Sequence, residues 1–141
     1  MEVMGQDMGM TNPTGGRIRN DGVGEGYWHA ARGSRVHLGI DLLLPEGIGQ
    51  QVVAPHSGVI VRNSFPYQGD ERFSGVLLEG ASAESRLWYL ESLLGIIGKF
   101  VKQGQVIGHA QDISIKYGKG CRPHVHWQIG KYGEIDPLIL L

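Results

Sequence analysis

The chain has 141 residues, which is enough for one domain with a hydrophobic core of its own. Hydrophobic residues make up 41% of the chain and charged residues 19%, as is usual for soluble globular proteins. The net charge is -1 and no basic run is present, so we expect neither nucleic acid nor a membrane surface as a partner. No apolar stretch is long enough to span a bilayer.

Residues 1–26 are rich in glycine, methionine, asparagine and aspartate. We interpret them as an irregular arm and leave open one short strand at GRIRN. The arm lacks the basic and apolar regions of a signal peptide. A function outside the cell would then require lysis, a dedicated export machine or incorporation into a particle such as a virion. Residues 27–141 would form the folded domain.

The stretch RVHLGIDLLLPEG is predicted to be a buried strand that ends at Pro45. Positions an even number apart share a face of a strand, so His37, Gly39 and Asp41 would point the same way. Gly39 has no side chain and would leave room for an ion. A buried aspartate beside a histidine needs a partner, and a hydrogen-bonded pair without metal is the alternative.

The middle of the chain reads as short strands separated by glycine turns. QVVAPHSGVIVRN predicts a hairpin with Pro55 and Gly58 at its corner, which would put His56 at the surface. GVLLEG is a further strand, and SRLWYLESL is a strand that runs into a turn. GKFVKQGQVIGHA resembles the first hairpin and indicates a weak internal repeat.

Glycine occurs 23 times and recurs between these short apolar runs. No segment repeats apolar residues with the period of about 3.6 that marks an amphipathic helix. The pattern therefore predicts an all-β fold: a small β-sandwich or barrel-like domain of antiparallel strands with few or no helices.

The stretch CRPHVHWQIG contains a predicted strand on which His124 and His126 share one face. By itself the pair also fits two solvated surface histidines. Together with His37 and Asp41 it supplies three or four nitrogen and oxygen ligands. Such a set suits zinc held by three protein ligands and one water. Cys121 is expected to be a loop thiol rather than a ligand.

Five stretches, in order, resemble the lysostaphin/LytM-type zinc metalloendopeptidases, which cut peptide bonds in bacterial peptidoglycan. They are HLGID, VVAPHSGVIV, GKFVKQGQVIG, RPHVHWQI and IDPLILL, and they extend over residues 32–141. The resemblance implies a duplicated β motif and one Zn²⁺ per chain. It also implies that His37, Asp41 and His126 are the ligands and that His124 is the general base.

The chain departs from the family at Tyr89, where active members carry a histidine. It resembles the leukocyte-derived chemotaxin and phage-like branch, which also has tyrosine there and is regarded as non-proteolytic. A phenol can donate a hydrogen bond to a developing oxyanion. It is a poor base, because its pKa is about 10. Tyr89 is therefore expected either to assist catalysis in this way or only to pack.

Three further residues near the first ligand strand are candidates for substrate binding: Arg32, Arg35 and Trp28. Arginine suits bidentate binding of a carboxylate. The expected function is a zinc metalloendopeptidase that acts on peptidoglycan peptides, for example at a phage tail tip beside other virion proteins. The alternative is a catalytically silent zinc-binding module of the same fold.

Overall fold

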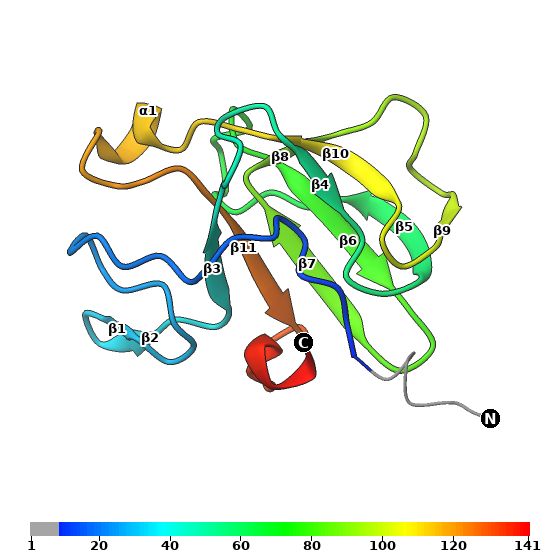
Figure 1. Ribbon diagram of the computed structural model, residues 1–141, viewed down its shortest axis with the longest axis horizontal. Helices are drawn as coiled ribbons and strands as arrows, with labels where there is room; N and C mark the ends of the chain where they lie inside the picture. Colours follow the sequence, from blue (N-terminus) through cyan, green and yellow to red (C-terminus); the bar gives the residue numbers. More distant parts are fainter. Residues whose placement is uncertain (1–8) are drawn as a thin grey trace.

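The structure is a computed structural model that describes residues 9–141, and it is built almost entirely from short strands (Figure 1). The strands are β1 (Ala31–Arg32), β2 (Arg35–Val36), β3 (Ile40–Leu43), β4 (Gln51–Val53), β5 (Gly58–Asn63), β6 (Gly75–Glu79), β7 (Glu84–Trp88), β8 (Leu90–Ser92), β9 (Phe100–Val101), β10 (Val106–Ala110) and β11 (His124–Ile129). The helices are α1 (Ser114–Tyr117) and the 3-10 helix η2 (Pro137–Leu140). None of the described helices is long and apolar enough to cross a membrane.

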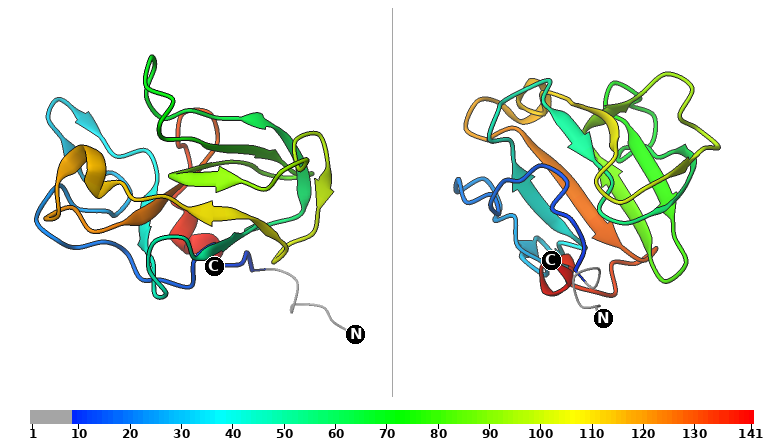
Figure 2. Two further views of the ribbon diagram at one scale, coloured as in Figure 1. Left: turned by 90° about the horizontal axis from the view of Figure 1, so that it is seen from above. Right: turned by 45° about the vertical axis from the view of Figure 1, so that its right-hand side comes forward.

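The strands form two main sheets and one separate hairpin. The larger sheet has six antiparallel strands in the order β3-β11-β7-β6-β5-β9, and the smaller has three in the order β4-β10-β8. The β1-β2 hairpin lies on the same side of the molecule as α1, beyond β3, in Figure 1 and in the left view of Figure 2. The predicted all-β fold of antiparallel strands with few helices is confirmed.

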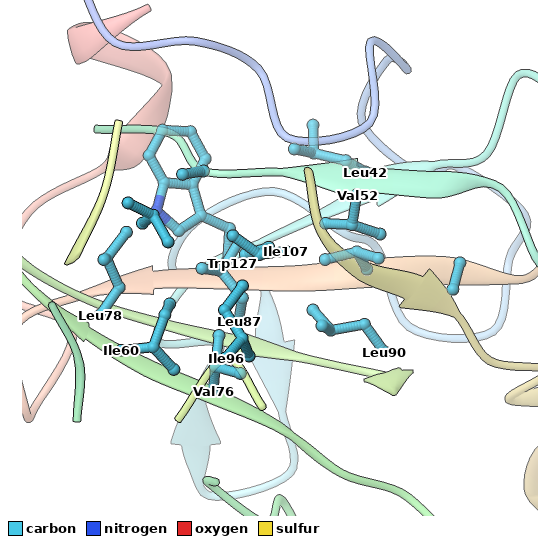
Figure 3. Close-up of a cluster of buried hydrophobic side chains, with 14 of the residues drawn as sticks. Leu42, Val52, Ile60, Val76, Leu78, Leu87, Leu90, Ile96, Ile107 and Trp127 are labelled. Atoms are coloured by element: carbon cyan, nitrogen blue, oxygen red, sulfur yellow. The ribbon is translucent and has the colours of Figure 1, made fainter. Parts of the chain in front are cut away.

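The hydrophobic core takes side chains from both main sheets (Figure 3). Strand β11 is buried along its whole length, and its residues alternate between two faces. Val125, Trp127 and Ile129 enter the core, and burial of each large side chain contributes about 1.5–3 kcal/mol. The opposite face of β11 carries His124 and His126, so the same strand that anchors the core presents the predicted site.

The two predicted hairpins are wrong, although all four of their strands are present. β4 and β5 lie in different sheets, and so do β9 and β10. Instead β4 pairs with β10 and β5 pairs with β9. Each β-turn-β unit passes from one sheet to the other at its turn, so its two strands cannot pair with each other, and each pairs with a strand of the other unit. The internal repeat therefore appears as a reciprocal pairing of two units.

The second half of the predicted arm packs against the edge of the larger sheet. Ile18 forms an isolated antiparallel bridge with Leu42 of the edge strand β3. The Arg19 N–H donates to the Asp41 carbonyl at 2.8 Å, and the Leu43 N–H donates to Arg17 at 2.9 Å. These bonds satisfy backbone groups that an edge strand would leave free. Residues 1–8 of the predicted arm lie outside the described residues.

His56 is buried, which corrects the prediction of a surface position. It is 8% exposed, and its Nε2 lies 2.7 Å from the Ser85 hydroxyl. The Trp127 indole N–H donates to the same hydroxyl at 3.1 Å, and the His56 Nδ1 lies 2.9 Å from the Ser57 carbonyl. A neutral imidazole completes this network, with Nδ1–H as donor and Nε2 as acceptor. Burial accordingly lowers the pKa of His56.

We expect His56→Gln to lower the free energy of unfolding by about 1–3 kcal/mol at pH 8, because the buried Ser85 hydroxyl loses its hydrogen-bond acceptor. The folded-state pKa of His56 lies below the unfolded value of about 6.5, so the unfolded chain binds more protons between the two values. The wild type therefore loses stability as the pH falls below about 6.5, and its advantage over the variant narrows.

Urea denaturation at several pH values between 8 and 5 measures this difference. The two proteins differ only at position 56, so the comparison isolates His56. His109→Gln, at an exposed histidine, is the matched control and should show no such narrowing. A difference between wild type and His56→Gln that stays constant with pH would contradict the account.

Candidate metal centre

Three buried side chains, His37, Asp41 and His126, converge on one point. Asp41 in β3 and His126 in β11 are cross-strand partners. His37 lies ahead of β3 rather than within it, and backbone hydrogen bonds to Ala30 and His29 hold it there. The His37 Nε2, the Asp41 Oδ1 and the His126 Nδ1 lie 3.1 Å from one another in all three pairs.

The position of the His126 ring depends on its two neighbours. The Trp88 indole stacks on the imidazole, with 4.7 Å between ring centroids and an angle of 15°. A Cβ at Gly39 would lie 2.9 Å from both Cε1 and Nε2 of His126. The missing side chain of Gly39 therefore makes room for the histidine ring, whereas the sequence had predicted room for the ion itself.

An oxygen acceptor lies beside the outer ring nitrogen of each of the two converging histidines, His37 and His126. The His37 Nδ1 lies 3.0 Å from the Tyr27 carbonyl, and the His126 Nε2 lies 3.1 Å from the Gln128 side-chain oxygen. The Gln128 amide nitrogen donates to the carbonyl of Lys131 at 3.1 Å, which sets its orientation. Each of these ring nitrogens must carry the N–H, so the His37 Nε2 and the His126 Nδ1 direct lone pairs at Asp41.

Three acceptor atoms at this separation repel one another unless a cation lies between them. Tetrahedral zinc with bonds of about 2.0–2.1 Å places its ligand atoms roughly 3.3 Å apart, close to the spacing seen here. The two nitrogens and one carboxylate oxygen therefore fit a zinc ion with an open fourth position.

The second oxygen of Asp41 is held by arginine. The Arg19 Nη2 donates to Oδ2 at 3.0 Å and the Arg19 Nε at 3.3 Å, while the Arg32 Nη2 lies 3.7 Å away. Arg19 is only 3% exposed. No sequence motif pointed to Arg19, and the only signal for it is the possible short strand at GRIRN, which places Arg19 beside β3. Arg19 leaves Oδ1 of Asp41 as the oxygen that faces the metal position.

His124 lies beside the three converging residues and is not one of them. Its Nδ1 is 2.7 Å from the Arg122 carbonyl, and its Nε2 is 3.6 Å from Oδ2 of Asp41. Burial lowers the pKa of His124. The imidazole is therefore neutral near pH 7, with the N–H at Nδ1 and a lone pair at Nε2.

Tyr89 occupies the point where the chain leaves one sheet for the other. Its backbone is left-handed, with φ 72°, between β7 of the larger sheet and β8 of the smaller. Its ring lies edge-on to His124, with 5.3 Å between centroids. Its hydroxyl is 2.8 Å from the Tyr67 hydroxyl, which is 2.7 Å from the Tyr117 hydroxyl. Burial raises the pKa of Tyr89, so the phenol is a hydrogen-bond donor and not a base.

These residues line an open groove with a cavity volume of about 770 Å³. The three converging residues line it together with His124, Tyr89, Arg32 and Arg35. Trp28 is not among the lining residues, and its contact with substrate stays a prediction. Its indole N–H donates to the Gly133 carbonyl at 3.0 Å, and its ring packs against the main core. Tyr67 also lines the groove, and so does Tyr117, to which no sequence motif pointed.

The model of peptidase family M23 matches residues 35–137. The chain belongs to this family. Bovine (Bos taurus) leukocyte cell-derived chemotaxin-2 is 27% identical over 125 residues, which cover 86% of this chain and 76% of that protein. The likeness to the lysostaphin-type metallopeptidases predicted from the sequence is therefore confirmed at the level of family and fold.

Two solved structures of lysostaphin share the fold. The catalytic domain of this antimicrobial peptidase from Staphylococcus simulans is 28% identical, with a TM-score of 0.55 over 75% of this chain and 77% of that domain. A solution structure of lysostaphin is 27% identical, with a TM-score of 0.55 over 75% of this chain. The match spans 42% of that longer lysostaphin chain.

We expect Arg19→Gln to weaken zinc binding about 10- to 100-fold, because outer-shell partners of metal ligands have effects of this size. Arg19→Lys should fall between this variant and the wild type, since lysine keeps the charge but lacks the two-pronged donor. Competition with a chelator of known affinity measures the constant, and circular dichroism checks the fold. Arg62→Gln, at an exposed arginine of β5, is the control. Unchanged zinc affinity in a folded Arg19→Gln protein would contradict the role given to Arg19.

Proposed function

We propose that this protein is a zinc-dependent endopeptidase that cleaves peptide bonds in bacterial peptidoglycan. The observation that carries the proposal is the convergence of two histidine lone pairs and one carboxylate oxygen at an open groove, beside a neutral histidine that is not a ligand. Membership of family M23 and the likeness to the lysostaphin catalytic domain support the reaction class. Peptidoglycan peptides are the substrates that the family resemblance implies.

His37, Asp41 and His126 would hold one zinc ion per chain. A bound zinc ion supplies Lewis acidity toward a peptide carbonyl and toward a water molecule. The protein's part is to direct three electron-pair donors at the metal position. The Tyr27 carbonyl and the Gln128 side-chain oxygen fix the histidine tautomers, so that the lone pairs of His37 Nε2 and His126 Nδ1 face that position, and Arg19 favours the ionised form of Asp41.

His124 is the residue that moves a proton. Its Nε2 lone pair accepts the proton of the attacking water and then delivers it to the amine that leaves. The Nδ1–H remains on the Arg122 carbonyl throughout, so the ring keeps its orientation. Oδ2 of Asp41, 3.6 Å from Nε2, stabilises the positive charge that His124 carries between the two transfers.

Tyr89 donates a hydrogen bond to the peptide carbonyl oxygen as negative charge develops there. Its raised pKa keeps the proton on the phenol at neutral pH. The hydroxyls of Tyr117, Tyr67 and Tyr89 form a chain of hydrogen bonds, and donors aligned along such a chain polarise one another. This arrangement supports a donor role for tyrosine where active relatives use histidine.

A silent zinc-binding module is the second candidate, and one observation favours it. The Tyr89 hydroxyl already has a partner in Tyr67, at 2.8 Å, which is what a purely packed tyrosine would show. Release of the protein outside the cell, or its place in a virion beside tail proteins, stays a prediction in either case.

The decisive experiment measures new amino termini released from purified peptidoglycan of several wall types. We expect release by the zinc-loaded protein and none after chelation. His124→Ala should lower the rate roughly 10²- to 10⁴-fold, and Tyr89→Phe roughly 10²- to 10³-fold. Both variants should still bind one zinc per chain, because neither residue is a ligand. No release from any wall type by protein that retains its zinc would leave the silent module as the function.

A further inference from the structure

The groove that holds the metal centre carries a local excess of positive charge. Its cationic residues are Arg19, Arg32, Arg35, Arg86 and Lys131. Asp41 is the only carboxylate in the part of its lining that the structure describes. Arg19 pairs with Asp41 and with Asp21, and Arg86 pairs with Glu84. The chain as a whole has a net charge of -1, so the excess belongs to this groove and will attract anionic ligands into it.

Two of these arginines face each other across the β1-β2 hairpin. Arg32 and Arg35 are cross-strand partners, and like charges in directly opposite positions destabilise a strand pair. Arg32 is anchored, because it donates to the Glu25 carbonyl at 2.7 Å and to the Ala31 carbonyl at 3.1 Å. Arg35 is exposed, and within residues 9–141 it has no carboxylate partner. An anion bound between the two guanidinium groups would relieve their repulsion.

The hairpin places this pair close to the reacting groups. The Arg32 Nη2 lies 3.7 Å from Oδ2 of Asp41, about one residue's length in an extended peptide. An anionic group held there belongs to the residue at the scissile bond or to its neighbour. A planar carboxylate matches the two-pronged donor of arginine. Lys131 lines the same groove and adds a further positive charge.

We propose that Arg35, with Arg32 and Lys131, forms a carboxylate-binding site beside the metal centre, and that the groove selects acidic peptides over neutral ones. The inference rests on the proposed function only in that the groove is taken to bind peptides. It implies that a wall peptide with a free carboxylate next to the cleaved bond is preferred to an amidated peptide or to a run of glycines.

Binding of three synthetic peptides tests this site without turnover. The first is a peptidoglycan stem tetrapeptide in which the α-carboxylate of the glutamate is free. The second is the same peptide with that carboxylate amidated, and the third is pentaglycine. Zinc-loaded His124→Ala protein is titrated with each in a calorimeter. We expect the free acid to bind about tenfold more tightly than the amide, since a bidentate charge-assisted contact is lost.

Arg35→Gln in the same background should reduce this preference to about twofold, and the additional change Lys131→Gln should abolish it. Arg35 and Lys131 are exposed, so both variants should fold. Lys102→Gln, at an exposed lysine that does not line the groove, is the matched control and should keep the full preference. Equal binding of acid and amide, or a preference that Arg35→Gln leaves intact, would overturn the proposal.

The proposed peptidase activity and the proposed carboxylate site can be refuted independently of each other. An Arg35-dependent preference for the free acid, in a protein that cuts no wall, supports the carboxylate site and refutes the peptidase. Equal cleavage of acidic, amidated and glycine substrates by both the wild type and Arg35→Gln supports the peptidase and refutes the carboxylate site.

Discussion

The buried carboxylate of Asp41 is the group around which the rest of the site is arranged. A carboxylate removed from water is costly unless each oxygen meets positive charge or a donor. Arg19 satisfies one oxygen, and the other faces the two lone pairs of His37 and His126. That second oxygen is satisfied only by a cation or a shared proton. A cation that satisfies Asp41 would therefore lie beside this oxygen, between the two histidine nitrogens.

The β architecture brings these groups together through one strand with two different faces. The odd-numbered residues of β11 pack in the core, and its even-numbered residues, His124, His126 and Gln128, line the groove. Packing of Trp127 therefore also determines where the imidazoles point. Tyr89 enters the same groove from the junction between the sheets, which its left-handed backbone makes possible. A helix-based scaffold would need a different spacing of residues to achieve this convergence.

The sequence was sufficient for the parts of the site that depend on local periodicity. His124 and His126 share a face because they lie two apart in a strand, and Asp41 lies in the strand that was expected. Arg19 and Tyr117 were missed, because they reach the site from an isolated β-bridge and from the short helix α1, whose positions depend on tertiary packing. The hairpins were wrong for a related reason: strand, turn and strand in sequence do not reveal that a turn crosses between sheets. His56 was misplaced with them, since that crossing turn buries it.

Zinc K-edge X-ray absorption of the purified protein tests the central claim most directly, because it reports the metal's own ligands. The account predicts one zinc per chain surrounded only by nitrogen and oxygen at about 2.0–2.1 Å, with two imidazoles among the ligands. Substitution of His37 should remove one imidazole from that shell, and substitution of His124 should remove none. A sulfur ligand at about 2.3 Å, a shell of six oxygens, or a protein that retains no zinc would contradict it.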